Sequence, residues 1–247
     1  FPVLVLEIAN PSCIRRTISF CEAVFDKEVE VEGVIAKRAD SLEEAFAIYE
    51  QGQIPVIIDE SGSIIQEVHP PVVVDAILAK RNLGTKITDA PVVIGVGPGF
   101  CAEKDVDAVI ETQRGHNLGR VIYEGEAAPN TGIPGMIGGY AKERVIHAPA
   151  AGNLHILKQI GEIVQAGDTI ADIEGTPVKI VIGGVLRGMI REGYPVTKGF
   201  KMADIDPRLN EYENCFTISD KARCIAGGVL EVLLSCGILP DVKTEEN

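Results

Sequence analysis

The sequence is short of basic residues. Its 247 residues contain 23 lysines and arginines against 36 aspartates and glutamates, which gives a formal charge of −13. A nucleic-acid-binding surface needs a basic stripe that displaces counterions, so this balance argues against a nucleic-acid partner. No stretch approaches the roughly 18 consecutive apolar residues of a membrane span. With 46% hydrophobic and 24% charged residues, the composition indicates a globular protein without membrane insertion.

The cysteines lack the spacing of a metal or redox motif. They stand at positions 13, 21, 101, 215, 224 and 236 and never approach CxxC. This argues against zinc ribbons and thioredoxin-type redox sites, and no metal site is predicted. Sparse cysteines in a long chain favour a reducing, cytoplasmic location.

The sequence also lacks an initial methionine. It opens at Phe1 inside an apolar run, residues 1–8, that predicts a strand buried on both faces. We therefore expect natural residues ahead of Phe1. Glu7 ends this strand, where dinucleotide-binding folds place an acid on a ribose hydroxyl, about 20 residues after a Gly-rich turn. That turn would precede Phe1; equally, Glu7 can be an ordinary acid at a strand end.

Strands and helices alternate through the N-terminal half, which predicts an α/β domain with a mostly parallel sheet over residues 1–142. A helix is expected to start at residues 10–12 and to bury Ile14, Ile18, Cys21 and Phe25. A second helix follows a capping box at Ser41. Further strands are predicted over residues 29–37, 54–59, 72–75, 91–96 and 106–111.

Several polar residues follow these strands, where ligands of such sheets bind. Arg15 and Arg16 near a helix start oppose its dipole, which suggests a nearby anion, acidic neighbours or a solvated face. Lys80, Arg81 and Asn82 follow one strand. Gly97 and Gly99 flank a proline after another, in a turn that can cradle an anion, although tight turns are the commoner use.

The loop over residues 114–120 concentrates the scarce basic residues. Arg114 and Arg120 can grip a phosphate, and His116, beside Asn117, can exchange a proton near neutral pH. No paired nucleophile is evident, so no catalytic residue is predicted. Binding is the safer interpretation of the loop.

A repeat occupies the C-terminal half. A shift of 32 residues aligns eight identities between 152 and 173, including Gly161 with Gly193 and residues 171–173 with 203–205. Two such copies can share one small core. Residues 146–206 thus resemble the all-β biotinyl/lipoyl-type barrel-sandwich hybrid. Carriers of that fold present a lysine on the hairpin between the copies. Residues 174–177 hold none and Lys179 falls in the next strand, so a swinging-arm carrier is not expected.

Residues 207–247 form the last segment, with a helix over 219–236 capped by Ser219. Its predicted buried stripe comprises Ala222, Ile225, Ala226, Val229, Leu230 and Leu233. Gly227 and Gly228 inside this helix indicate close packing. Lys221 and Arg223 suggest either an anion site or salt bridges. Residues 241–247 are predicted to be a frayed tail.

Several segments match one family closely. They are residues 7–20, 74–85, 97–100, 109–120, 130–132 and 215–223. On these segments the sequence resembles the accessory proteins of the selenium-dependent molybdenum hydroxylase system. The resemblance implies a Gly-rich, Rossmann-type opening ahead of Phe1, so the Rossmann-like domain here would be truncated. It also implies a role in maturing a hydroxylase of the xanthine-dehydrogenase type, by handling its cofactor or its labile selenium.

The leading hypothesis is a maturation factor that binds a small anionic ligand, either a molybdopterin dinucleotide or NAD(P). The alternatives are an NAD(P)-dependent oxidoreductase-like enzyme and a non-catalytic scaffold whose residues 146–206 dock the hydroxylase. The candidate binding residues are Glu7, Arg15, Arg16, Lys80, Arg81, Asn82, Gly97, Gly99, Arg114, His116, Asn117, Arg120, Ser219, Lys221 and Arg223.

Overall fold

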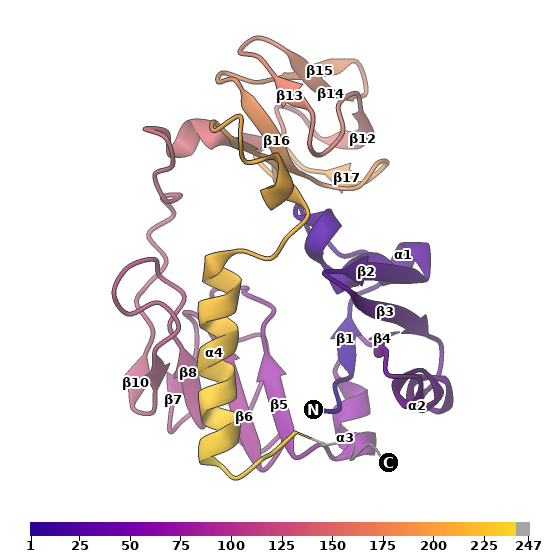
Figure 1. The fold of residues 1–247 in the computed structure, drawn as a ribbon, viewed down its shortest axis with the longest axis vertical. Helices are drawn as coiled ribbons and strands as arrows, with labels where there is room; N and C mark the ends of the chain where they lie inside the picture. The colour runs from indigo at the N-terminus through magenta and orange to yellow at the C-terminus, as the bar shows by residue number, and fades with distance from the viewer. Residues whose placement is uncertain (241–247) are drawn as a thin grey trace, which may run out of the picture. The chain divides into compact units, whose positions relative to one another are not determined.

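The computed structural model describes residues 1–240 and has a mixed α/β fold (Figure 1). The chain forms two compact units. We call Phe1–Val3, Asp59–Gly132 and the chain from Ser219 the parallel-sheet unit, and Leu4–Ile58 with Ile133–Ile218 the repeat unit. These boundaries differ from the sequence-based ones at 142, 146 and 206. The predicted tail, residues 241–247, lies outside the described residues.

The repeat unit begins with a four-stranded sheet in the order β1-β4-β3-β2. Strands β1 (Val5–Glu7) and β3 (Val34–Ala39) both pair in parallel with β4 (Ile54–Ile58), whereas β2 (Glu28–Val31) is antiparallel to β3. The single strand predicted over 29–37 is therefore a hairpin. Its turn, at Glu32 and Gly33, takes the left-handed backbone conformation that tight hairpins require.

The Ser41 cap of α2 (Leu42–Glu50) is confirmed, but the reciprocal bond of the predicted capping box reaches the residue before the cap. The Ser41 hydroxyl accepts the backbone N–H of Glu44 at 3.1 Å, and the Glu44 carboxylate accepts the N–H of Asp40 at 2.9 Å. The first bond satisfies a donor that the helix start leaves without a partner, and the second ties Glu44 to the residue before the cap.

The prediction of a helix that starts at residues 10–12 is wrong. The segment forms two 3-10 turns, η1 (Arg16–Ile18) and η2 (Phe20–Glu22), and the short helix α1 (Ala23–Asp26). Ser19 is extended between the turns, and its hydroxyl accepts the N–H of Cys21. A serine that bonds to nearby backbone competes with helix continuation. The first strand is also shorter than predicted, because β1 covers only Val5–Glu7 and its residues are partly buried.

The two sequence repeats form matching sets of strands. The first copy holds β12 (Gly152–Ile156), β13 (Ile163–Val164) and β14 (Thr169–Ile173). The second copy holds β16 (Gly184–Met189), β17 (Pro195–Val196) and β18 (Lys201–Asp206). Each copy gives one strand to the other, because β13 pairs with β16 and β17 pairs with β12.

These strands build two four-stranded sheets over one core. The orders are β11-β18-β16-β13 and β15-β14-β12-β17, with β11 (Val145–His147) and β15 (Thr176–Lys179) as added edges. The core includes Leu154 and Ile173 from the first copy and Leu186 and Ile205 from the second. Lys179 lies in β15, as predicted. The short turns η3 (Lys142–Arg144) and η4 (Tyr212–Cys215) flank the two sheets in sequence.

The parallel-sheet unit carries its own sheet in the order β5-β6-β8-β9. Strands β5 (Val72–Asp75), β6 (Val92–Val96) and β8 (Ala108–Ile110) are parallel, and β9 (Val121–Ile122) is antiparallel to β8. The unit also contains α3 (Ser63–Val68) and the paired strands β7 (Cys101–Ala102) and β10 (Gly125–Glu126). The one sheet expected over residues 1–142 is therefore two sheets, because β4 and β5 pair with different neighbours.

The C-terminal helix α4 (Asp220–Ser235) packs on this sheet (Figure 1). Ser219 caps it, as predicted, by accepting the N–H of Ala222. Val232 is buried against Ile94 and Ile110 of the strands. The predicted stripe is partly wrong, because Ala222, Ala226 and Leu230 are exposed. No helix within residues 1–240 is long and apolar enough to cross a membrane.

Candidate functional site

Three loops meet at the carboxyl edge of the parallel strands, where open α/β sheets bind ligands. They are residues 76–85 after β5, 97–100 after β6 and 111–120 after β8. A Cβ added at Gly99 would lie 2.5 Å from the backbone of Arg81, and one added at Gly97 would lie 2.9 Å from the Thr112 hydroxyl. Gly97 and Gly99 thus permit the close approach of the other two loops. They have positive φ values of 85° and 113°.

Two acids that the sequence analysis did not single out hold these loops in shape. Asp75, at the end of β5, is buried and accepts hydrogen bonds from the Thr85 hydroxyl at 2.6 Å and from the N–H of Ile77. Glu111 follows β8 and is 6% exposed; its two oxygens accept the N–H groups of Gln113 at 2.7 Å and Ala128 at 2.8 Å. Both acids directly end apolar strands, a pattern that could have indicated their role.

We expect Glu111→Gln to lower the free energy of unfolding by about 1 kcal/mol. A glutamine amide has a single acceptor oxygen, so one of the two backbone N–H groups loses its partner. Urea denaturation measures the change. Glu124→Gln, at an exposed position in the same unit, is the matched control and should match the wild type. Equal stability of both variants would contradict a role for Glu111 in holding the loops.

Most of the basic residues predicted for this edge have exposed side chains. Lys80, Arg81, His116 and Arg120 are exposed, and their side chains make no hydrogen bond or ion pair with residues 1–240. Arg114 differs, because its guanidinium grips the Asp220 carboxylate at 2.9 and 3.1 Å. This hydrogen bond raises the pKa of Arg114.

The backbone around Lys80 is unusual. Leu78 and Lys80 have φ values of 59° and 63°, a region that residues other than glycine seldom occupy. Asn82 supports the same loop, because its side chain donates to the carbonyl of Thr85 at 2.7 Å and accepts the N–H of Gly84 at 2.8 Å. Ile77 and Leu83, in the same loop as Lys80 and Arg81, expose apolar side chains.

The other predicted residues of this unit lie in the loop after β8 and at the start of α4. Asn117 is exposed, and its carbonyl accepts the N–H of Arg120 at 3.0 Å. Ser219 is taken up by the cap of α4, and Lys221 and Arg223 lie in the first turn of that helix.

Glu7, Arg15 and Arg16 belong to the repeat unit and not to this edge. The Glu7 carboxylate accepts the N–H of Ile8 at 2.8 Å. Arg16 donates to the carbonyl of Met189 at 2.8 Å and pairs with Glu22 at 3.8 Å. The acidic-neighbour alternative therefore accounts for Arg16. Arg15 donates to the carbonyl of Asn214 at 2.8 Å.

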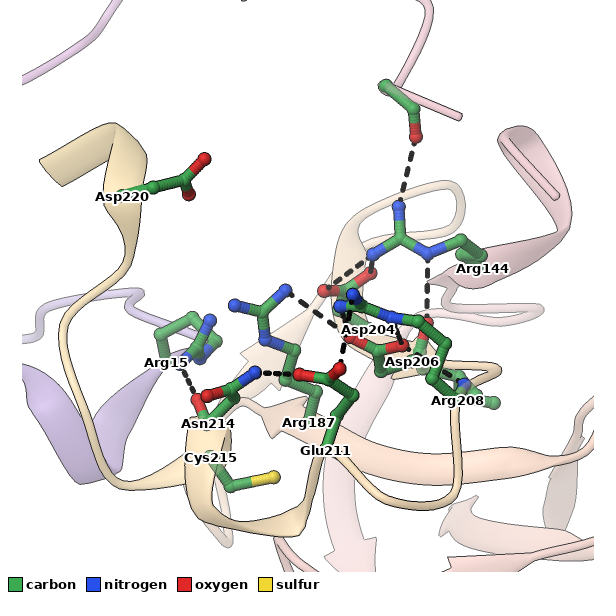
Figure 2. Close-up of polar contacts among 12 residues, drawn as sticks. Arg15, Arg144, Arg187, Asp204, Asp206, Arg208, Glu211, Asn214, Cys215 and Asp220 are labelled. Carbon is green, nitrogen blue, oxygen red and sulfur yellow. Dashed lines mark hydrogen bonds and ion pairs between the residues drawn. The ribbon is translucent and has the colours of Figure 1, made fainter. Parts of the chain in front are cut away.

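Arg15 joins a second charged cluster that sequence reasoning missed (Figure 2). Its other members come from η3, β16, β18 and the segment after β18, and they are Arg144, Arg187, Asp204, Asp206, Arg208 and Glu211. Asp206 is fully buried and accepts hydrogen bonds from the Arg208 guanidinium at 2.8 and 2.9 Å. Arg187 pairs with the same carboxylate at 3.7 Å. The sequence signal that could have indicated this cluster is Asp204-Ile205-Asp206, in which two acids flank an apolar residue.

The two aspartates respond to this cluster in opposite ways. Burial raises the pKa of Asp204, although Arg144 and its cationic neighbours favour the charged form. Burial also opposes ionisation of Asp206, but hydrogen bonds and charge from Arg208 outweigh it and lower the pKa. Burial and the nearby charge of Arg187 lower the pKa of Arg15. The buried Nε atoms of Arg15 and Arg187 have no hydrogen-bond partner within the described chain.

No group of three or more histidine, cysteine, aspartate or glutamate side chains in residues 1–240 could hold a metal ion. The carboxyl edge offers exposed basic and apolar side chains.

The chain is similar to one curated protein, the uncharacterized protein YqeB of Escherichia coli (strain K12). The two are 51% identical over 234 residues, which is 95% of this chain and 43% of YqeB. The chain thus spans less than half the length of this relative. No protein-family model matches the sequence, and no solved structure matches it.

Proposed function

We propose that the chain is an accessory protein that matures a selenium-dependent molybdenum hydroxylase of the xanthine-dehydrogenase type. In this role it binds an anionic, nucleotide- or pterin-dinucleotide-like ligand at the carboxyl edge of β5, β6 and β8. The observation that carries the proposal is the contact of three strand-end loops through Gly97 and Gly99. Two of these loops expose the side chains of Lys80, Arg81, His116 and Arg120. In a chain with a charge of −13, such a set of basic residues suits an anion.

The composition of the loops supports a ligand with both a phosphate and a ring. Lys80, Arg81 and Arg120 offer positive charge, and the exposed side chains of Ile77 and Leu83 offer apolar contact for a heterocycle. The strained backbone at Leu78 and Lys80 is the kind of local cost found at binding loops.

We also propose a fold assignment for the parallel-sheet unit and one for the repeat module. The parallel-sheet unit is Rossmann-like, which the parallel order β5-β6-β8 and the glycines after β6 support. The repeat module is a barrel-sandwich hybrid, supported by the strand exchange between its two copies. In the alternative of a non-catalytic scaffold, this module would dock the hydroxylase.

Thermal unfolding of the chain with ADP, CDP, GDP, NADP or inorganic phosphate tests the binding proposal. A ligand at ten times its Kd adds about 1.4 kcal/mol, which raises Tm by about 3 to 5 °C. We expect a nucleotide to produce such a shift and the Arg81→Ala/Arg120→Ala variant to lose most of it.

The matched control is Lys104→Ala, an exposed cation of the same unit in the turn before β8, which should keep the full shift. No shift with any of these ligands, or an undiminished shift in the double variant, would overturn the binding proposal. Hydride transfer from NADPH to an added acceptor would favour the oxidoreductase alternative instead.

A further inference from the structure

Two cysteines of the repeat unit lie close together although they do not form a CxxC motif. Cys13 is half-buried and Cys21 is buried, and their side chains are hydrogen-bonded to each other. The Ser19 hydroxyl lies 3.0 Å from the Cys21 sulfur. The two 3-10 turns bring Cys21 back to Cys13, a proximity that the absence of CxxC spacing did not predict.

The two thiols are chemically unequal. The hydrogen bond from Cys21, with help from Ser19 and the N–H of Arg15, outweighs burial and lowers the pKa of Cys13 to about 6. Donation of the same hydrogen bond, together with burial, raises the pKa of Cys21. The charged form is therefore favoured at the more accessible Cys13 and opposed at the buried Cys21.

The surrounding segment is fixed by the repeat module. The Ile14 carbonyl accepts the N–H of Met189 at 2.7 Å, and Arg16 donates to the carbonyl of Met189. A Cβ added at Gly188 would lie 2.8 Å from the Ile14 carbonyl, so the two backbones are in close contact.

Charged groups also flank the pair. Glu22 is buried and opposes ionisation of both thiols. Arg191 at 2.8 Å and Arg16 at 3.8 Å compensate its charge. Arg191 also pairs with Asp26, and Arg15 contributes positive charge near Cys13.

We propose that Cys13 and Cys21 form a thiol–disulfide exchange site for small-molecule disulfides, with Cys13 as the nucleophile and Cys21 as the resolving thiol. The arrangement of a more accessible thiolate beside a buried protonated thiol is the one that such exchange requires. The site lies within the repeat unit and does not depend on the anion-binding proposal.

The exchange balances in two steps. The Cys13 thiolate attacks one sulfur of a disulfide RSSR, which forms a Cys13–SR bond and releases RS⁻. Cys21 gives its proton to this RS⁻ and then attacks the Cys13 sulfur, which forms the Cys13–Cys21 disulfide and releases the second RS⁻. The second RS⁻ takes up from solvent the proton that Cys13 had released. In sum, two protein thiols are oxidised and one small disulfide is reduced to two thiols.

The test uses the full chain with oxidised glutathione, analysed by intact mass and peptide mapping. We expect loss of two hydrogen atoms and a Cys13–Cys21 linked peptide. Cys21→Ser should accumulate the Cys13–glutathione mixed disulfide, whereas Cys13→Ser should form neither product at residue 21. The exposed Cys236 is the control, and Cys236→Ser should leave the linkage unchanged. Absence of the linked peptide in excess oxidised glutathione would overturn the proposal.

A second measurement needs no variant. The rate of alkylation of Cys13 by iodoacetamide should show its inflection near pH 6. At pH 6, we expect Cys13 to react about tenfold faster than an unstructured cysteine peptide added as a competitor, after allowance for the lower nucleophilicity of a less basic thiolate. An inflection at the value of the competitor peptide would contradict a nucleophilic Cys13.

Discussion

An Arg144→Met variant should lose about 3 kcal/mol of the free energy of unfolding of the repeat unit. Arg144 is 5% exposed and donates to the carbonyls of Ile205 and Gly135, each at 3.1 Å, and to the Asp204 carboxylate at 3.2 Å. Removal of one partner leaves a buried carboxylate without its main compensating charge, which is the costly way to break a buried ion pair. Urea denaturation, with hydrogen exchange to locate the loss, measures the effect.

The pH dependence of this loss has a defined sign. Because folding raises the pKa of Asp204, its contribution to stability is fully present below the unfolded pKa and is lost as the pH rises through the folded value. Arg144→Met raises that folded value further, so the deficit of the variant should shrink as the pH falls from 7 towards 4.

Matched variants separate charge from packing at this position. Asp204→Asn introduced into Arg144→Met should restore part of the stability and remove the pH dependence, and Arg144→Lys should lie between the wild type and Arg144→Met. A deficit that is constant with pH and unchanged by Asp204→Asn would show that Asp204 is not the group left uncompensated.

Gly228→Ala should destabilise the parallel-sheet unit by about 2 kcal/mol, whereas Gly227→Ala should stabilise it by up to about 1 kcal/mol. A Cβ at Gly228 would overlap the carbonyl oxygen of Gly119, and overpacking against backbone costs more than alanine gains in a helix. Gly227 is exposed and has no atom within 4 Å of the position of its Cβ.

The two substitutions are at adjacent positions and are expected to change the free energy of unfolding in opposite directions. Each variant therefore serves as the control for the other. Thermal or urea unfolding of the two single variants gives the comparison directly. Destabilisation by both substitutions, or by neither, would contradict the close approach of α4 to the loop at Gly119. Because Gly119 belongs to the loop of Arg114 and Arg120, Gly228→Ala should also weaken any nucleotide-induced shift in Tm.

Local features of the fold were predictable from the sequence. The repeat fixed strand positions correctly, so that β13 (Ile163–Val164) and β17 (Pro195–Val196) lie 32 residues apart. The caps at Ser41 and Ser219 are confirmed, because a cap depends on a few neighbouring residues. Close packing is confirmed for Gly228 but not for Gly227, since two adjacent helical positions point in different directions.

Long-range pairing was not predictable in the same way. The strand at residues 54–58 has the apolar pattern of a buried strand whichever neighbour it pairs with, so the division into two sheets was missed. The contact of Arg144 with Asp204 joins positions 60 residues apart. The contact of Cys13 with Cys21 depends on the two 3-10 turns that stand where a helix was expected. At the carboxyl edge, the basic loops were found from composition, but the buried acids Asp75 and Glu111 that shape them were not.

The exchange of β13 and β17 between the two repeats has a consequence for how this module can be divided. Each copy supplies an edge strand that completes the sheet of the other, so a single copy would leave both an open strand edge and half a core. A peptide of one copy would therefore be expected to associate with a second identical peptide about a twofold axis. The repeat module therefore has the architecture of two similar subunits within one chain, with the hairpin at Glu174–Gly175 in the segment that joins them.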